Sequence, residues 1–487
     1  MPRWEWRAFG DSFGRAEARI GEMDTTIQES DDLYLLSVAS NASVKVRGGQ
    51  MDVKELQEVD RDGLEQWKPV LKADFPLTAA EAATVLGALG VDETPGQDEY
   101  TLDQLLAAAP GLLALEVCKR RRHVTLDGAM GELSTLSTDR GDLRTIVVES
   151  EDPALVAAAV RGLGFDPRRN VNVPRGLKEL VGLGRFAVID VGTNSVKFVI
   201  SERTKDGAWR TVTERAEVTR LGEGLDRTGN LGEEPIARTV DAIADLAGEA
   251  EREAVVDTAA VGTAGLRMAG NSEAFIDAVR ERAGIDVEVI SGEEEARLAY
   301  VAVTSDLQLG DGSVVLFDTG GGSSQFTFGH GREVDERFSV DVGAVRFTEQ
   351  FALDGVVPVE RLAEALNAIA VDLERLDDRE TPDELVGIGG AVTNLAAVEH
   401  ELETYDPSVI RGTVLDRAEV DRQIELYRTR SADERRELAG LQPKRAEVIL
   451  AGACVVRTVL EKLGCDSLTV SDRGLRHGLL RERFDRP

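Results

Sequence analysis

One pattern occurs twice in this sequence and limits the folds open to it. It consists of an apolar strand that ends in Asp, a glycine turn and a second apolar strand. The copies are RFAVIDVGTNSVKFVISE (185–202) and GSVVLFDTGGGSSQFTFGHG (312–331). Strands alternate with helical segments between and after them, which predicts an α/β fold with covered sheets. The recurrence predicts two similar lobes that face a cleft.

Each copy supplies the two kinds of group that a phosphate beside a divalent cation requires. Glycines and small hydroxyl residues let backbone amides approach the phosphate closely, and a carboxylate at the strand end can hold the metal ion. Asp190 and Asp318 are therefore the candidate metal ligands. A hairpin turn explains a single Asp-Gly loop equally well, whereas two matched copies favour a shared chemical task.

Three further turns join strands to helices in the same region. The turn GIGGAVTN (387–394) opens a helix whose N-terminus suits an anion, although such a turn can also simply connect a strand to a helix. Arg267 follows a similar turn and could bridge phosphate oxygens or form a surface ion pair. In SGEEEAR (291–297), acidic residues stabilise the first helical turn, and a glutamate that faces a cleft could instead deprotonate water.

Composition argues against several classes of function. The chain has 57 Lys and Arg against 89 Asp and Glu, and the net charge of −32 argues against nucleic acid as a partner. Its apolar runs are shorter than the ~20 residues that span a bilayer, and the N-terminus lacks a signal-peptide core. Three scattered cysteines indicate neither a disulfide framework nor a metal site. We expect a soluble cytoplasmic protein with no membrane partner.

Six segments resemble the exopolyphosphatase/guanosine pentaphosphate phosphatase family in order and spacing. They are VIDVGTNSVKFVI, VGTAGLRMAGN, VISGEEEARLAY, LFDTGGGSSQF, DVGAVRF and GIGGAVTNLAA. The resemblance implies an α/β two-lobed actin-like ATPase (ribonuclease-H-like) fold, with lobe I at 185–307 and lobe II at 308–487. It also implies an enzyme that uses Mg²⁺ to release terminal phosphate from polyphosphate or guanosine pentaphosphate, and a possible homodimer.

The resemblance implies roles for individual residues as well. Glu295, the last Glu before Ala-Arg, matches the catalytic base, and Asp190 and Asp318 match the metal-associated aspartates. Gln325 departs from the family, whose second loop usually has Glu there; glutamine can orient water but brings no charge to a metal. The positions expected to contact phosphate are Thr193, Asn194, Ser195, Arg267, Gly320, Gly321, Gly322, Ser323, Gly389, Gly390 and Thr393.

Basic residues on strands mark the region before residue 178, which a Pro- and Gly-rich stretch (166–184) separates from the rest. Several lie two positions apart and therefore share one strand face. A closed or strongly curled sheet would collect them in its interior, where an anion could bind; the alternative is a set of solvated strand faces. The candidates are Lys45, Arg47, Lys54, Lys119 and Arg121.

This region resembles the CYTH (triphosphate tunnel) superfamily in VKVRGGQMDVKEL, EVCKRRRHVTLDG and LRTIVVESEDPALVAAAVRGLGF. The resemblance implies an α+β tunnel-like domain at 1–178 that binds polyphosphate-like anions. The opening Glu-x-Glu-x-Lys of the superfamily reads Arg3-Trp-Glu-Trp-Arg7 here, so only the middle glutamate survives, beside Glu132 and Glu149. We therefore expect this domain to bind rather than to catalyse.

Two other interpretations stay open. Gln325 and the eroded N-terminal signature favour a non-catalytic sensor that binds polyphosphate or an alarmone and signals by lobe closure. A kinase of the same superfold is the third, but the sequence shows no distinct sugar or acetate site. Phosphate release by the wild type, compared with Glu295→Ala, separates the enzyme from the sensor.

Overall fold

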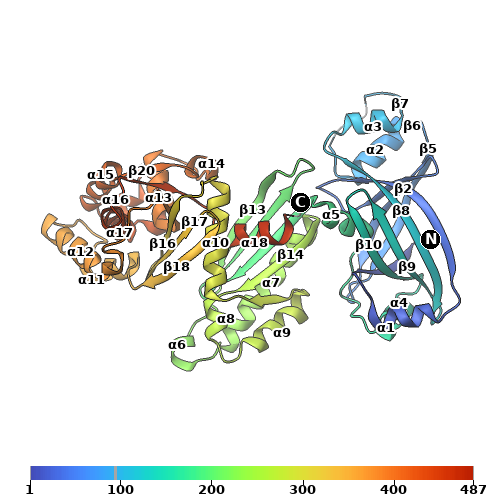
Figure 1. The fold of residues 1–487 in the computed structure, drawn as a ribbon, viewed down its shortest axis with the longest axis horizontal. Coiled ribbons are helices and arrows are strands. Elements are labelled where there is room, and N and C mark those ends of the chain that lie inside the picture. Colours follow the sequence, from blue (N-terminus) through green and yellow to red (C-terminus); the bar gives the residue numbers. More distant parts are fainter. Residues whose placement is uncertain (1, 93–95, 486–487) are drawn as a thin grey trace. The chain divides into compact units, whose positions relative to one another are not determined.

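The computed structural model describes residues 2–92 and 96–485 (Figure 1). The chain divides into two compact units, Met1–Val289 with Glu482–Pro487, and Ile290–Arg481. The first unit holds an N-terminal barrel and an open sheet, and the second holds another open sheet. The units divide at 289/290, ahead of the lobe boundary expected at 307/308. None of the described helices is long and apolar enough to cross a membrane.

Eight antiparallel strands form a closed barrel, so the predicted closed sheet is confirmed. Side chains alternate between the two faces of a strand, and β8 accordingly buries Lys119 and Arg121 while it exposes Arg120 and Arg122. In spatial order the strands are β1 (Arg3–Phe9), β10 (Gly141–Ser150), β9 (Ala129–Thr138), β8 (Leu113–Leu126), β2 (Thr26–Leu36), β3 (Ser43–Arg47), β4 (Gln50–Val59) and β5 (Glu65–Asp74).

Apolar clusters lie between the barrel and its helices. One cluster packs around Trp6 and Val156, and a second packs around Leu77 and Val85. Thr78 caps the helix that follows it through a capping box. The elements that surround the barrel are α1 (Gly14–Gly21), β6 (Leu77–Thr78), α2 (Ala79–Ala88), β7 (Glu99–Tyr100), α3 (Leu102–Ala108), α4 (Pro153–Gly162) and α5 (Val173–Val181).

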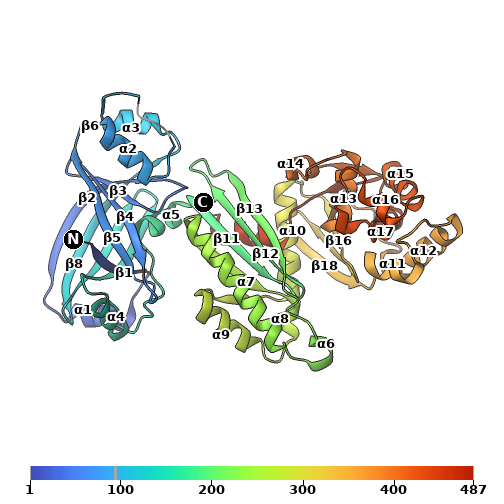
Figure 2. The same cartoon turned by 180° about the vertical axis from the view of Figure 1, so that it is seen from behind.

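The open sheet of the first unit has the order β13-β12-β11-β14-β15 (Figure 2). Strands β11 and β12 form an antiparallel hairpin, and β14 runs parallel to β11 on its other side. The elements are β11 (Gly184–Val191), β12 (Ser195–Arg203), β13 (Trp209–Val218), α6 (Leu225–Thr228), α7 (Glu233–Arg252), β14 (Val255–Gly262), α8 (Ala264–Met268), α9 (Ser272–Ala283) and β15 (Val287–Val289).

The sheet of the second unit repeats this plan and adds a sixth strand, in the order β18-β17-β16-β19-β21-β20. Its strands are β16 (Ser313–Thr319), β17 (Ser324–His330), β18 (Glu333–Val340), β19 (Glu384–Ile388), β20 (Val414–Asp416) and β21 (Ser467–Val470). In both sheets the strand that ends in Asp is the third, between a hairpin partner and a parallel strand. The two similar sheets agree with the recurrence in the sequence.

Helices of the second unit enclose a large apolar core in which α17 is almost wholly buried. Thr393 and Asn394 lie on α13, which directly follows β19. The helices are α10 (Gly292–Asp306), α11 (Ala344–Phe351), α12 (Val359–Asp372), η1 (Glu374–Leu376), α13 (Gly389–Glu399), α14 (Pro407–Ile410), α15 (Arg417–Arg428), α16 (Ala432–Arg436), η2 (Pro443–Arg445), α17 (Ile449–Lys462) and α18 (Leu475–Phe484).

Candidate functional site

The first Asp loop joins β11 to β12 through a tight turn. The N–H of Gly192 donates to the carbonyl of Ser195 at 3.0 Å, and the N–H of Gly222 donates to the carbonyl of Thr193 at 2.8 Å. Two N–H groups of the same neighbouring turn donate to the carbonyl of Asn194. No acceptor in the described residues takes the N–H of Thr193 or of Asn194. The carbonyls of Thr193 and Asn194 are held by these hydrogen bonds, so the two N–H groups remain available to bind an anion.

Close packing fixes the conformation of this loop. A Cβ at Gly222 would collide with the methyl group of Thr193, and a Cβ at Gly265 would lie 3.0 Å from the Thr193 hydroxyl oxygen. Asp190 is buried at the end of β11, and its Oδ2 lies 3.9 Å from the Nζ of Lys197. Arg267 lies exposed on α8, two residues after Gly265. The first unit thus brings together the loop and the helix that carries Arg267.

The second Asp loop repeats the turn. The N–H of Gly320 donates to the carbonyl of Ser323 at 2.9 Å, and the first two N–H groups of α11 donate to the carbonyls of Gly320 and Gly321 at 2.9 and 2.8 Å. Across 2–92 and 96–485, the N–H groups of Gly321, Gly322 and Ser323 have no acceptor. Three consecutive N–H groups are therefore available to bind an anion.

Backbone contacts fix this second loop. A Cβ at Gly343, just before α11, would collide with the backbone of Gly321 and Gly322. Asp318 at the end of β16 pairs in register with Gln325 on β17, and the Gln325 side chain is exposed. The departure at Gln325 therefore lies directly across the hairpin from the candidate metal ligand.

The third glycine turn lies next to Asp318. Gly389 has a φ of +85°, and a Cβ there would collide with the Asp318 carboxylate. A Cβ at Gly390 would collide with the guanidinium of Arg445, which has no ion-pair partner among the residues that the structure describes. The hydroxyl of Thr393 donates to the carbonyl of Gly389 at 3.1 Å. A free cation and the N-terminus of α13 thus adjoin the second loop, which favours an anion there.

Buried polar side chains hold the turn that carries Arg445. The side-chain amide of Asn394 donates to the carbonyl of Gly390, and its oxygen accepts from the N–H of Gln442, both at 2.8 Å. Arg435 is fully buried and donates to four backbone carbonyls, including the one that follows Arg445. The position of Arg445 is therefore set by the fold.

Helix α10 presents three glutamates in its first turn. Glu293 pairs with Arg337 at 2.5 Å, and Glu294 pairs with Arg297 at 2.6 Å. The hydrogen bond from Arg337 lowers the pKa of Glu293 to about 2. Glu295, the predicted base, lies half-buried on the same helix. Ion pairs and their place in the first helical turn account for Glu293 and Glu294, and the role of Glu295 stays a prediction.

The barrel contains a pocket of about 260 Å³ that collects charged side chains. All five predicted anion-binding residues line it, together with Arg7, which the sequence analysis did not propose. Glu5, Glu132 and Glu149 line it as well, so the carboxylates that survive from the superfamily signature also face the pocket. The six cations are Arg7, Lys45, Arg47, Lys54, Lys119 and Arg121.

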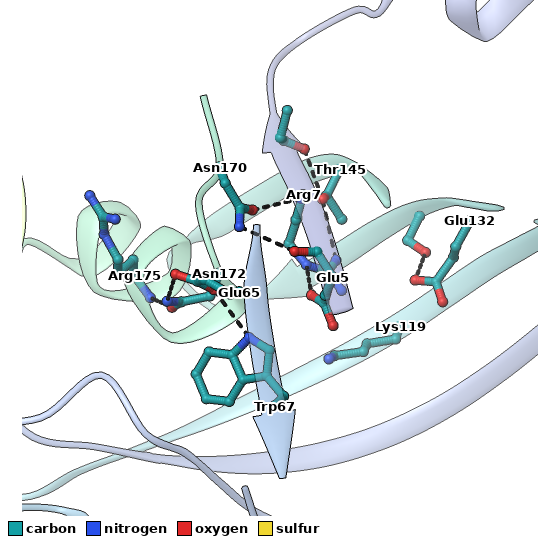
Figure 3. A network of polar contacts seen from close by, with 12 residues as sticks. Glu5, Arg7, Glu65, Trp67, Lys119, Glu132, Thr145, Asn170, Asn172 and Arg175 are labelled. Atoms are coloured by element: carbon teal, nitrogen blue, oxygen red, sulfur yellow. Dashed lines mark hydrogen bonds and ion pairs between the residues drawn. The ribbon is translucent and has the colours of Figure 1, made fainter. Parts of the chain in front are cut away.

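The N-terminus of α5 forms part of the pocket wall (Figure 3). The Asn172 oxygen accepts from the N–H of Arg175 at 3.0 Å, and its amide donates to Glu65 Oε1 at 3.1 Å. The indole of Trp67 donates to the other Glu65 oxygen at 3.1 Å. Burial raises the pKa of Glu65 to about 7. On the far side of α5, the guanidinium of Arg175 donates to the carbonyl of Val256 on β14.

Sequence reasoning missed several residues that the structure places at these sites. Arg7 and Lys197 lay within segments that had already been singled out, so their strand positions were a usable signal. No sequence signal pointed to Arg445 or Asp32. Only the folded chain brings Arg445 beside Gly390 and Asp32 beside the cations of the barrel.

Comparison with known proteins agrees with this geometry. The profile of the Ppx/GppA phosphatase family matches residues 199–486, more than half of the chain. An exopolyphosphatase 2 of Mycobacterium tuberculosis is 33% identical over 61% of this chain and 98% of its own length. A bifunctional 3-dehydroquinate synthase/phosphatase of Fusobacterium nucleatum is 29% identical, but the match spans only 46% of that protein. The crystal structure of an Aquifex aeolicus Ppx/GppA phosphatase has a TM-score of 0.58 and 34% identity, covering 61% of this chain and 99% of that one.

Two matched sheets, each with an Asp-Gly loop at its third strand, define the actin-like ATPase type of fold. The chain belongs to the Ppx/GppA phosphatase family and is a hydrolase. The family expected from six motifs is therefore confirmed. The roles of single residues and the CYTH likeness of the barrel stay predictions.

Proposed function

We propose that this hydrolase uses Mg²⁺ to release the terminal phosphate of inorganic polyphosphate or of guanosine pentaphosphate. The matched pair of loops carries the proposal. Each loop follows an apolar strand that ends in Asp, and each leaves consecutive N–H groups without an acceptor in the described part of the chain. Such amides bind phosphate oxygens and stabilise the charge that develops during phosphoryl transfer.

In an in-line displacement, separate residues of the chain deprotonate the attacking water and hold the phosphate. Glu295 accepts a proton from the water that attacks the terminal phosphorus. The loop amides and the guanidinium groups of Arg267 and Arg445 hold the phosphate oxygens while the bond to the bridging oxygen breaks. The shortened chain leaves with the bridging oxygen, and the terminal group departs as orthophosphate.

The carboxylates present suit a magnesium ion that the substrate helps to hold. Asp190 and Asp318 each supply hard oxygens at the end of a strand, and the described residues contain no group of three His, Cys, Asp or Glu arranged around a metal. Mg²⁺ commonly binds through one or two carboxylates together with substrate phosphates. When bound, it would neutralise phosphate charge; Asp190 and Asp318 are the residues that would hold it.

We propose that the barrel is a CYTH-like module that captures the same polyanion. The six cations of its pocket support this, because an acidic chain concentrates positive charge there. Capture would raise the local concentration of polyphosphate near the hydrolytic lobes. Arg47→Ala with Lys54→Ala should then raise KM for long polyphosphate more than for tripolyphosphate. Equal KM changes for both lengths would refute capture.

Phosphate release separates the enzyme from a sensor that binds without turnover. We expect Glu295→Gln to lose about 10²–10⁴ in kcat, the usual contribution of a general base, while polyphosphate binding persists. Glu293→Gln is the matched control, since it changes a carboxylate in the same helical turn that is already paired with Arg337. Wild-type protein that binds polyphosphate and guanosine pentaphosphate but releases no more phosphate than Glu295→Gln would establish the sensor, which Gln325 favours.

A further inference from the structure

One fully buried carboxylate, that of Asp32, lies against the cations of β3 and β8. The side chain of Asp32 on β2 has no exposed surface, and its two oxygens accept hydrogen bonds of 2.6 Å from the guanidinium of Arg47. Its Oδ2 also lies 3.6 to 3.7 Å from the charged nitrogens of Lys45, Lys119 and Arg121. Four cations from β3 and β8 thus converge on one acid.

Asp32 lies behind these cations rather than in the path of a ligand. The residues that line the described pocket include all four cations but not Asp32. The neighbouring interior residue on β2, Tyr34, accepts a 2.5 Å hydrogen bond from Lys119, whose Nζ lies 4.5 Å from the ring centroid. An anion can therefore reach the cations without displacing the carboxylate that supports them.

The cations need such support because Lys45, Lys119 and Arg121 are buried and all four cations repel one another. Burial and the neighbouring Arg47 lower the pKa of Lys45 to about 8, and Asp32 opposes this shift. Burial and Lys45 lower the pKa of Lys119 well below its usual range, and Asp32 again opposes the change. Burial alone would raise the pKa of Asp32, but Arg47 and the two lysines outweigh it and lower it to about 2. The acid is charged at every physiological pH.

Other charged groups around the cluster do not replace Asp32. Asp52 on β4 lies 3.9 Å from Lys45 and pairs with none of the other three cations in the described structure. Glu5 and Glu132 act chiefly on Arg7, whose pKa they raise against the effect of burial. Lys54, also on β4, adds positive charge that lowers the pKa of Lys45, an effect that Asp32 opposes.

We propose that Asp32 is the positioning residue of the barrel anion site, and that it keeps the buried Lys45 and Lys119 charged and aligns all four cations for a polyphosphate-type anion. The inference rests on the proposed role of the barrel in anion capture. If Asp32 instead acted as an internal anion that competes with the ligand, its removal would strengthen anion binding. Removing one partner of a buried ion pair leaves an uncompensated charge, which favours loss over gain.

Binding of tripolyphosphate to the full-length protein without divalent cations tests this proposal. Tryptophan fluorescence reports the barrel, because three of the four tryptophans (Trp4, Trp6 and Trp67) lie on its strands and Trp67 lines the pocket. The variants are Asp32→Asn, which keeps size and shape, and Asp52→Asn, which removes a carboxylate from Lys45 alone. Each is titrated from about pH 6 to about pH 9, a range that extends to either side of the pKa of Lys45, which is about 8.

We expect Asp32→Asn to bind about tenfold or more weakly than wild type near pH 7.5, since one pKa unit in a lysine corresponds to a factor of ten. Its affinity should recover near pH 6, where Lys45 is protonated again, and the alkaline limb of the profile should move to lower pH. Asp52→Asn should stay within about twofold of wild type, as expected for a partly exposed pair.

Four results would overturn the proposal. Tighter binding by Asp32→Asn would show a competing anion, and an equal loss at all pH values would show a purely structural role. If Asp32→Asn does not fold, the wild-type profile decides: affinity must hold to about pH 7.5 and fall only above it, and an earlier fall contradicts the proposal. Absence of binding by the wild type would remove the barrel site altogether, whereas phosphate release by the lobes would still be measurable.

Discussion

The two Asp loops have the same turn but are braced by different parts of the chain. In each, a glycine N–H two residues after Asp donates to a serine carbonyl three residues further on, at 3.0 Å from Gly192 and 2.9 Å from Gly320. The first loop is held through the Thr193 side chain and the turn at Gly222, whereas the second is held by the backbone at the start of α11. The two loops therefore share a set of N–H groups that have no acceptor among the described residues. They differ in the contacts that hold the turn in place.

The loops also differ in the residue that faces each aspartate across its hairpin. Asp190 pairs in register with Lys197, and Asp318 pairs with Gln325. A lysine ammonium 3.9 Å from Asp190 offsets part of its charge, while the neutral Gln325 offsets none of the charge of Asp318. If the proposed function holds, we expect the first loop to contribute a cation to phosphate binding and the second to depend more on Mg²⁺.

Gly343→Ala should have the largest effect, because its Cβ would strike the backbone of the second loop, which cannot rotate away. We expect kcat/KM for polyphosphate to fall by about 10²–10³, the loss that follows removal of one oxyanion donor. Gly355→Ala is the control, since a Cβ there meets nothing within 4 Å. Normal activity in a folded Gly343→Ala protein would mean that the amides of this loop do not hold the reacting phosphate.

Arg445→Ala should raise KM by about tenfold to a hundredfold, since a hydrogen bond to a charged group contributes about 1.5–3 kcal/mol. The neighbouring Lys444 is exposed, so Lys444→Ala removes the same charge from the same turn and should change KM little. Steady-state kinetics with tripolyphosphate would measure both. Equal effects of the two changes would exclude a specific contact by Arg445.

Gly222→Ala should cost less than Gly343→Ala, because its Cβ meets the methyl group of Thr193 rather than backbone. We expect about a tenfold loss of kcat/KM, corresponding to roughly 1.4 kcal/mol. Thr193→Ser removes that methyl, so the double variant should recover most of the activity. A loss that Thr193→Ser does not relieve would show that the first loop is braced in some other way.

Gln325→Glu should have the smallest effect on rate and the clearest effect on metal use. A second carboxylate facing Asp318 would tighten Mg²⁺ binding, so half-maximal activity should require several-fold less Mg²⁺, with kcat changed about threefold at most. Titration of Mg²⁺ at saturating polyphosphate measures this. An unchanged Mg²⁺ requirement would show that residue 325 does not contribute to the metal site.

Sequence patterns predicted most of the frame because it rests on local signals. Apolar strands that end in Asp predicted β11 and β16, and cations two apart on a strand predicted the interior of a closed sheet, where Lys119 and Arg121 lie. The edge strands β13 and β18 were not predicted. Both are polar and largely exposed along their length, so no buried face marks them in the sequence.

Parts of the candidate site depend on contacts between distant segments, which no local pattern encodes. Arg445 reaches Gly390 because Asn394 and the fully buried Arg435 hold its turn. Asp32 gains its significance only when β3 and β8 flank β2 in the barrel. The folded chain brings these residues together through contacts between distant segments, whereas the sequence alone shows only that they are charged.

A double-mutant cycle on the two aspartates tests the central claim most directly. Phosphate release from polyphosphate would be measured for Asp190→Asn, Asp318→Asn and the double variant, with folding checked by circular dichroism. If both loops serve one phosphate and its Mg²⁺, the double variant should lose about as much kcat/KM as the worse single variant, because groups that act as a unit are not additive. Losses that multiply, or a silent change at either aspartate, would contradict the account.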